Sequence, residues 1–213
     1  MKKYEFTGET KEIKLLFRTA VLHRIRATVS FGFVKIGDLG GWIEKEENLS
    51  HEGKAWVCGD AKVWGNAKVC GDAEVCGDAK VCGDAKVWGN AKVCGDAEVC
   101  GDAKVCGDAE VCGDAKVCGD AKVCGDAEVF SASHVLVIGA IGSRNDFTTF
   151  YRDKDNEITV KCGCFLGKID RFLEKVTQTH GDSKYALVYR AAVEVAKLQI
   201  DLLGEAPKDA DEE

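Results

Sequence analysis

Cysteine is the residue type whose number and spacing in this sequence could do chemistry. The 213 residues include twelve cysteines, and ten of them recur at one position of a six-residue repeat: Cys58, Cys70, Cys76, Cys82, Cys94, Cys100, Cys106, Cys112, Cys118 and Cys124. Regularly spaced thiolates could bind soft metal ions such as Cu(I) or Zn²⁺. The interpretation that we prefer is simpler, because duplication of the repeat would multiply any surface residue compatible with β-structure.

A second group of polar side chains follows the repeat. It consists of Ser143, Arg144, Asn145, Asp146, Thr148, Thr149 and Arg152. Arg144 and Arg152 could each hold a phosphate or carboxylate through two parallel hydrogen bonds, which predicts a ligand-binding site for a small anion. The alternative is that these side chains supply hydrogen-bond partners to the open backbone edge at the end of the repeat.

A partial metal-binding set lies further along the chain. Cys162 and Cys164 flank a glycine, and together with His180 they would supply three of the four ligands of a structural zinc site. No fourth ligand is evident, so the set is a weaker hypothesis than the anion site. We therefore predict no cofactor.

The repeat determines the elements that must position these groups. From Ala55 the chain reads Ala-Lys/Glu-Val-Cys/Trp-Gly-Asp/Asn, with valine at every sixth position from Val57 to Val129. The same phase continues without insertion at Val135, Ile141 and Phe147. A period of six forms no stripe on a helix of 3.6 residues per turn, but it suits a short strand followed by a glycine corner. Three such sides predict an 18-residue triangular coil with alanine and valine inside.

Stacking such coils would place equivalent side chains in columns. The cysteine columns are Cys58, Cys76, Cys94 and Cys112 on one face, Cys82, Cys100 and Cys118 after Trp64 on the second, and Cys70, Cys106 and Cys124 with Trp88 on the third. Neighbouring thiols would lie near disulfide distance, but parallel side chains seldom adopt the required dihedral angle. In a reducing compartment we therefore expect outward-facing free thiols.

Charged side chains would form columns as well. Lys68, Lys86, Lys104 and Lys122 share one face and could contact an anionic partner. Acids stack at the corners, including Asp60, Asp78, Asp96 and Asp114. Mutual neutralisation of the two kinds of charge is the simpler interpretation.

The pairing of Val57 with Ala61, repeated in every later unit, resembles the hexapeptide-repeat family. The resemblance implies a left-handed parallel β-helix, and it implies a homo-oligomer, since trimers are common in that family. Many members are acyltransferases with a histidine base, but the regular repeat contains none of the four histidines and extrudes no loop. His134, beside Ser133, is the candidate base, with a surface histidine as the alternative. Three converging histidines for a catalytic zinc are not found in the repeat.

The flanks are predicted to cap the solenoid, whose open ends would otherwise expose unpaired strand edges. We predict an N-terminal β cap (1–50), the solenoid (51–147), a β-hairpin with two helices (148–204) and a disordered acidic tail (205–213). The hairpin strands are 147–152 and 157–162. One helix aligns Ile169, Phe172, Leu173 and Val176 on one face and stops at Gly181. A second, over 183–203, aligns Tyr185, Val188, Ala192, Val195, Leu198 and Leu202 on one face.

Two segments outside the regular repeat carry a second resemblance. Residues 37–50, Gly-Asp-Leu-Gly-Gly-Trp-Ile-Glu-Lys-Glu-Glu-Asn-Leu-Ser, and residues 142–151, Gly-Ser-Arg-Asn-Asp-Phe-Thr-Thr-Phe-Tyr, resemble hexapeptide-repeat proteins encoded in bacteriophages and prophages. This implies a phage accessory or host-interaction role and says little about activity.

Composition limits the remaining possibilities. The net charge of −7 argues against nucleic acid as a partner. No apolar run approaches the roughly 18 residues that span a bilayer, and no apolar run follows the first lysines as in a signal peptide, so we expect a cytoplasmic protein of the bacterial host. The sequence thus predicts a non-catalytic structural or binding solenoid with an unknown protein or small-anion partner. The alternative is a protein that binds and sequesters a small anion or nucleotide, and acyl transfer is less well supported.

Overall fold

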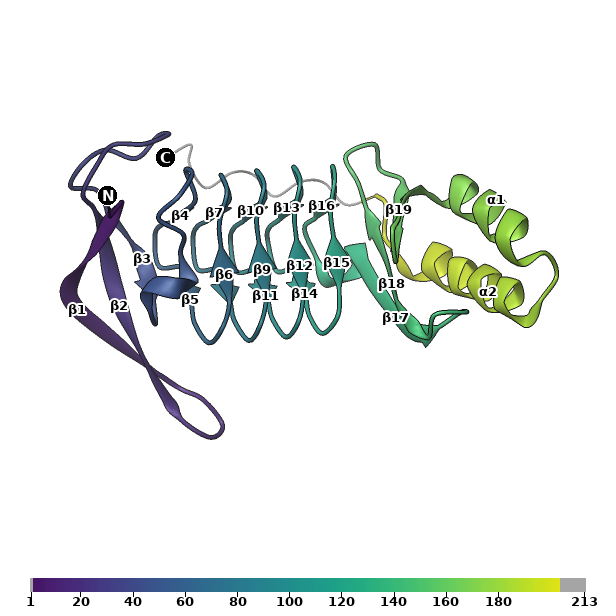
Figure 1. Ribbon diagram of the computed structural model, residues 1–213, viewed down its shortest axis with the longest axis horizontal. Helices are drawn as coiled ribbons and strands as arrows, with labels where there is room; N and C mark the ends of the chain where they lie inside the picture. The colour runs from purple at the N-terminus through teal and green to yellow at the C-terminus, as the bar shows by residue number, and fades with distance from the viewer. Residues whose placement is uncertain (1, 204–213) are drawn as a thin grey trace.

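A computed structural model describes residues 2–203 of the chain (Figure 1). A central β-solenoid is flanked by an antiparallel β region at its N-terminal end and by a β-sheet with two helices at its C-terminal end. This mainly β architecture with 18-residue coils confirms the predicted fold class. The predicted acidic tail, residues 205–213, lies outside the described residues.

The solenoid is built from two-residue strands that follow one another every six residues. They are β4 (Trp56–Val57), β5 (Lys62–Val63), β6 (Lys68–Val69), β7 (Glu74–Val75), β8 (Lys80–Val81), β9 (Lys86–Val87), β10 (Lys92–Val93), β11 (Glu98–Val99), β12 (Lys104–Val105), β13 (Glu110–Val111), β14 (Lys116–Val117), β15 (Lys122–Val123) and β16 (Glu128–Val129). Every third strand pairs in parallel, so that Val93 lies between Val75 and Val111. The three sheets run β4-β7-β10-β13-β16, β5-β8-β11-β14 and β6-β9-β12-β15, and the second continues into the N-terminal region.

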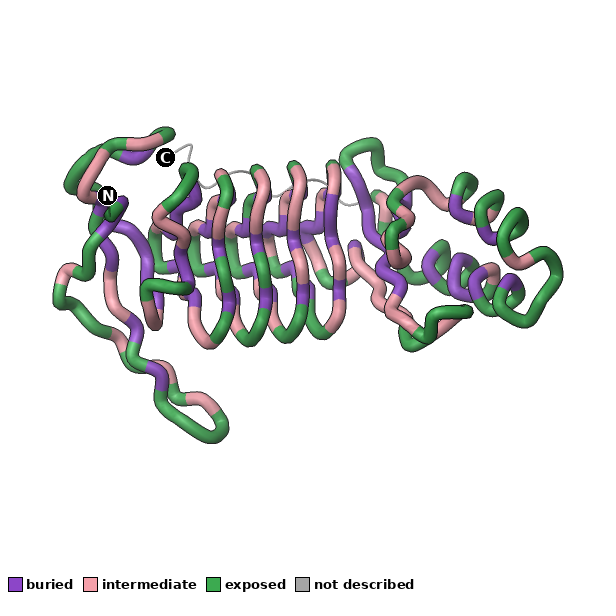
Figure 2. The backbone as a smooth tube through the Cα atoms, in the orientation of Figure 1, coloured by how far each residue is buried: buried purple, intermediate pink, exposed green. Residues whose placement is uncertain are grey.

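Alanine and valine fill the interior of the coils, as predicted. Every repeat valine from Val57 to Val129 and every repeat alanine from Ala55 to Ala127 is buried (Figure 2). Burial of each valine contributes about 1.5–3 kcal/mol, and the stacked core contains no polar side chain that would need a partner. Glycine is required at the corners: Gly107 has φ +77°, and a Cβ there would lie 2.8 Å from the backbone nitrogen of Gly125.

The N-terminal region begins with a long antiparallel hairpin formed by β1 (Tyr4–Lys14) and β2 (Thr19–Ala27). The hairpin projects away from the solenoid axis (Figure 1). Strand β3 (Leu39–Ile43) pairs antiparallel with β2 and parallel with β5, so it joins the hairpin to the first coil. A short 3-10 helix, η1 (Glu46–Asn48), follows.

The coils end at Val129, which corrects the expectation that they continue through Val135, Ile141 and Phe147. After β16 a 3-10 helix, η2 (Ala132–His134), takes the place of a glycine corner, because Ser131-Ala132 replaces Gly-Asp. Strand β17 (Val135–Ile141) then pairs antiparallel with β18 (Asp146–Arg152). Strands β19 (Ile158–Cys162) and β20 (Phe165–Lys168) complete the sheet. The predicted hairpin of residues 147–152 and 157–162 is confirmed.

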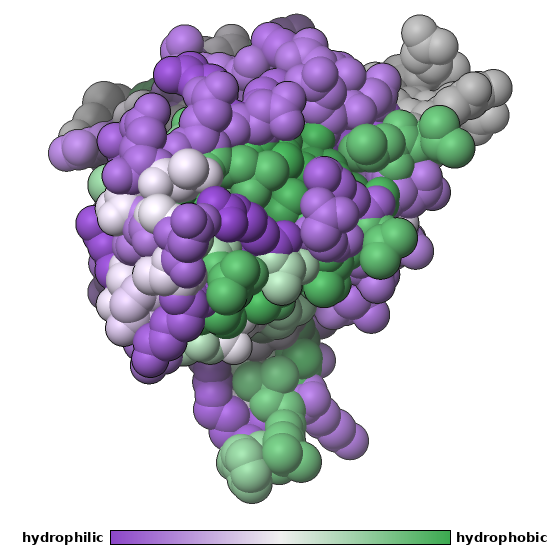
Figure 3. Space-filling model, turned by 90° about the vertical axis from the view of Figure 1, so that its right-hand side faces the viewer, coloured by the Kyte–Doolittle hydropathy of each residue, from purple (hydrophilic) through white to green (hydrophobic). Residues whose placement is uncertain are grey.

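Helices α1 (Ile169–His180) and α2 (Lys184–Gln199) pack against this sheet and against each other. Helix α1 ends at Gly181 (φ +55°), as predicted. The face aligned by the sequence is not the one along which α2 packs, because Tyr185, Val188, Val195 and Leu198 are exposed and only Ala192 of that face is buried. The buried residues of α2 are Ala186, Tyr189, Ala192, Val193 and Ala196. Their alanines allow the helix to approach its neighbours closely, and this leaves larger apolar side chains on the end of the molecule (Figure 3).

Candidate functional site

The structure divides the predicted anion-binding group into two sets. Ser143, Arg144 and Asn145 occupy the turn between β17 and β18, where Asn145 adopts a positive φ of 49°. Asp146, Thr148, Thr149 and Arg152 belong to β18, the strand that covers the last coil. The two arginines therefore do not converge on one ligand.

The strand set closes the solenoid, and the direction of the hydrogen bonds explains how. Most hydrogen bonds between coils run from an N–H of one coil to a carbonyl of the next, as from Cys106 N to Val123 O (3.0 Å), so the last coil is left mainly with unpaired donors. Thr149 Oγ1 accepts from Lys122 N at 3.0 Å. Tyr151 OH accepts from Cys124 N at 3.3 Å and donates to Cys124 O at 2.8 Å.

The opposite end has the opposite need, since the first coil leaves carbonyls unpaired. Two side chains donate hydrogen bonds to these carbonyls: the Lys3 ammonium to Ala55 O at 2.7 Å, and Asn48 Nδ2 to Ala67 O at 2.8 Å. Lys3 is buried, and desolvation lowers its pKa from 10.5 to about 8. Both caps thus complete the backbone ladder with side chains.

The remaining members of the strand set also have structural partners. Arg152 is buried, donates from Nε to Asn156 Oδ1 at 2.8 Å and lies 5.3 Å from the centre of the Phe130 ring. Thr148 is buried and lies 3.3 Å from Cys162 Sγ. Asp146 lies 3.9 Å from the Lys122 ammonium. These contacts leave the turn, with Ser143 and Arg144, as the part that could meet a ligand.

That turn opens onto a cavity of about 470 Å³ in the C-terminal cap. The cavity lies between the turn, the β19–β20 connection and one face of α1. Its lining residues are Ser143, Arg144, Cys162, Cys164, Phe165, Phe172, Lys175, Val176, Thr179, His180 and Tyr189. Two groups that the sequence suggested separately, the Ser143-Arg144 pair and the Cys162-Cys164-His180 set, therefore meet at one place. We call it the cap cavity.

The charge of the cap cavity is unlike that of the chain as a whole. Arg144 and Lys175 line it, and no aspartate or glutamate of residues 2–203 is among the lining residues. Neither cation forms an ion pair within the described part of the chain. The Arg144 guanidinium lies against Gly163, where a Cβ would be 2.8 Å from Nη1. Glycine between the two cysteines thus makes room for the guanidinium.

Aromatic rings form the floor of the cap cavity. Phe172 lies 5.3 Å from Phe165 and 5.5 Å from Tyr189, ring centre to ring centre, and the His180 ring lies 5.8 Å from Tyr189. Desolvation raises the pKa of Tyr189, so its hydroxyl remains a neutral donor. The cavity can therefore offer cations, hydroxyl donors and flat apolar surface to one ligand.

The predicted metal-binding residues share the cap cavity without forming a coordination site. Within residues 2–203 no three side chains of His, Cys, Asp or Glu are arranged to hold a metal ion. The His180 ring instead packs near Tyr185 and Tyr189. Lys175, Phe165 and Tyr189 were not predicted as site residues. Lys175 is an exposed residue of α1, just before the buried Val176, and no pattern in the sequence sets it apart from other surface lysines.

A groove of about 790 Å³ follows the lysine column. The predicted register is confirmed, because Lys104 pairs with both Lys86 and Lys122. The groove is also lined by Asp84, Asp102 and Asp120, so its charge is mixed. Compared with the cap cavity it shows no preference for an anion.

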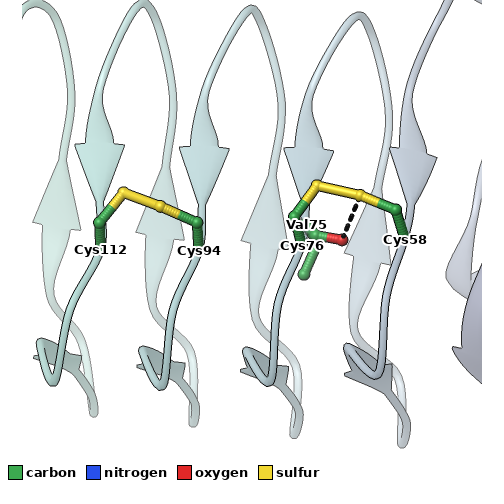
Figure 4. Close-up of a disulfide and its surroundings, with 5 residues drawn as sticks. All are labelled: Cys58, Val75, Cys76, Cys94 and Cys112. Atoms are coloured by element: carbon green, nitrogen blue, oxygen red, sulfur yellow. Dashed lines mark hydrogen bonds between the residues drawn. A yellow bond between two sulfur atoms is a disulfide. The ribbon is translucent and has the colours of Figure 1, made fainter. Parts of the chain in front are cut away.

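Four cysteines are not free, which corrects the expectation of free thiols throughout. Cys58 is bonded to Cys76, and Cys94 to Cys112, across neighbouring coils (Figure 4). The Cα atoms of these pairs are only 4.7 and 4.5 Å apart, because parallel strands of successive coils stack directly. The columns are not fully exposed either: most cysteines are half-buried, and Cys112 and Cys124 are buried.

His134, the candidate base for acyl transfer, is a buried structural residue. It is 3% exposed, and its Nδ1 accepts the backbone N–H of Phe130 at 3.1 Å. Desolvation, followed by the charge of Arg152, lowers its pKa. The expectation of a surface histidine is therefore wrong. The ring supports the bend by which the chain leaves the last coil.

The fold and the sites define the class of the protein as a β-solenoid with capped ends, cross-coil cysteine pairs and a cavity in its C-terminal cap. No family model matches the sequence, and no curated protein matches it. None of the helices within residues 2–203 has the length and apolar character to span a membrane.

Proposed function

We propose that this chain is a non-catalytic binding protein whose C-terminal cap takes a small anion with a flat apolar part. The observation that carries the proposal is the lining of the cap cavity, which contains Arg144 and Lys175 and, among residues 2–203, no carboxylate, in a chain of net charge −7. Unpaired cations in a concave site favour an anionic ligand. The solenoid then serves as a rigid support that carries the cap.

The size and chemistry of the cavity support this ligand class. Its volume of about 470 Å³ is within the range of small-molecule sites. The guanidinium of Arg144 suits two parallel hydrogen bonds to a carboxylate or phosphate. The half-buried ring of Phe165, supported by the buried rings of Phe172 and Tyr189, supplies apolar surface for a planar group.

Within the part of the chain that the structure describes, the histidine geometry supports binding over acyl transfer. His134 is buried with its Nδ1 engaged, and the regular coils contain no histidine. A phage origin and a homo-oligomer stay proposals that rest on the resemblances of the sequence. A place in the host cytoplasm stays a proposal that rests on the lack of an apolar run, and the Cys58–Cys76 and Cys94–Cys112 disulfides do not support it.

Calorimetric titration of the full chain with inorganic phosphate, benzoate and adenosine monophosphate tests the proposal. We expect the two aromatic anions to bind more tightly than phosphate. Arg144→Gln and Lys175→Gln should each weaken binding by about tenfold, or about 1.4 kcal/mol. Arg171→Gln is the matched control, because Arg171 is an exposed cation of α1 that does not line the cap cavity. Binding that is absent, or equally strong in all three variants, would contradict the proposal.

A further inference from the structure

The second cysteine column contains a close pair of thiols that are not joined. Cys82, Cys100 and Cys118 follow β8, β11 and β14, which pair in register. The sulfur atoms of Cys100 and Cys118 are 2.8 Å apart. Since a disulfide bond is about 2.05 Å long, the two sulfurs need to approach by only about 0.8 Å.

The backbone already permits such a bond. Cys94 and Cys112 belong to the same two coils, one side of the triangle earlier, and they form a disulfide with Cα atoms 4.5 Å apart. Cys100 and Cys118 occupy the equivalent positions on the next side, because all coils contain 18 residues. A bond between them therefore requires side-chain rotation without movement of the strands.

The pair is also within reach of a reagent. Cys118 is exposed, and the neighbouring Gly119 has open space around it. The third column differs, since Cys124 is buried beneath the C-terminal cap, where its backbone binds Tyr151. Cys118 is therefore the thiol that should react first with a small disulfide from the solvent.

We propose that Cys100 and Cys118 form a reversible dithiol/disulfide pair that is oxidised by low-molecular-weight disulfides. The Cys118 thiolate attacks the small disulfide, which gives a mixed disulfide and releases one small thiolate. The Cys100 thiolate then attacks Cys118 Sγ and expels the second small thiolate. The pair loses two electrons and two protons, and the small disulfide becomes two thiols. The product is a further covalent link between the coils that carry β11 and β14.

Peptide mapping of the full chain after incubation with oxidised glutathione tests the proposal. The protein is alkylated and digested with trypsin without reduction, which places Cys100 in residues 93–104 and Cys118 in residues 117–122. The Cys94–Cys112 disulfide already joins residues 93–104 to residues 105–116, so the new link is the one to residues 117–122. We expect these two peptides to become joined and to separate again after treatment with reduced glutathione. The rate should rise from pH 7 to 9, because only the thiolate reacts and desolvation raises the pKa of Cys118 above its ordinary value.

Three variants make the test specific. In Cys100→Ser the joined peptide should be lost and glutathione should stay attached to Cys118. In Cys82→Ser the joined peptide should form as before. Cys70→Ser is the matched control, because the next coil presents Trp88 beside Cys70 instead of a second cysteine.

Three outcomes would overturn the proposal. They are the absence of the joined peptide at saturating oxidised glutathione, a stable glutathione adduct on Cys118 in the unaltered protein, and a link from residues 93–104 to residues 81–86, which contain Cys82.

Discussion

Removal of one hydroxyl group from Tyr151 tests the account of how the solenoid is closed. Tyr151 is fully buried, and its hydroxyl is the partner of both the N–H and the C=O of Cys124. In Tyr151→Phe both backbone groups lose that partner where the cap excludes water. A buried unsatisfied polar group costs about 1–3 kcal/mol, and the 3.3 Å hydrogen bond is the weaker of the two. We therefore expect the free energy of unfolding to fall by about 2–4 kcal/mol.

Because a solenoid is stabilised by interactions between neighbouring coils, the lower stability of the variant should show first as more frequent opening of the C-terminal cap from the last coil. Native-state hydrogen exchange at the Cys124 amide reports this opening. A change of about 3 kcal/mol corresponds to roughly 100-fold faster exchange. Thr149→Val removes only the acceptor for Lys122 N and should cost about half as much.

Tyr185→Phe is the matched control, since Tyr185 is an exposed residue of α2. It should leave both the exchange rate and the urea midpoint unchanged. The reasoning is refuted if Tyr151→Phe changes stability by less than about 0.5 kcal/mol, the range of ordinary surface substitutions, with the Cys124 amide still protected.

Two further predictions concern the corners and the N-terminal cap. Gly107→Ala should destabilise the protein more than Gly119→Ala, as measured by urea unfolding, because φ is positive at both positions but only at Gly107 would the Cβ meet backbone, 2.8 Å from Gly125 N. The Lys3 pKa of about 8 lies below its unfolded value, so the folded state binds fewer protons and stability from this group should rise between about pH 8 and 10.5. Lys3→Met should remove that increment, and an identical pH profile in the variant would contradict it.

The coils could be derived from the sequence because every repeat unit forms the same short strand and corner. Alternation within Ala-Lys-Val-Cys assigns the inside and the outside, and Gly-Asp supplies the corner, so no information about distant residues is needed. The period of six therefore predicts the 18-residue coil, the alanine–valine core and the columns of lysine and cysteine. The phase alone failed beyond Val129, where valine still recurs at Val135 but the glycine corner does not.

The cap cavity and the pairing of the cysteines were decided only by the tertiary structure. Arg144, Cys164 and Lys175 are far enough apart in the chain that only the packing of the turn, the hairpin and α1 brings them to one cavity. Periodicity likewise places large apolar residues on one face of α2, but the face that is buried in the structure is the one rich in alanine, because it allows closer packing. Whether stacked thiols join depends on side-chain rotation at fixed strand spacing, and a sequence period contains no information about rotation.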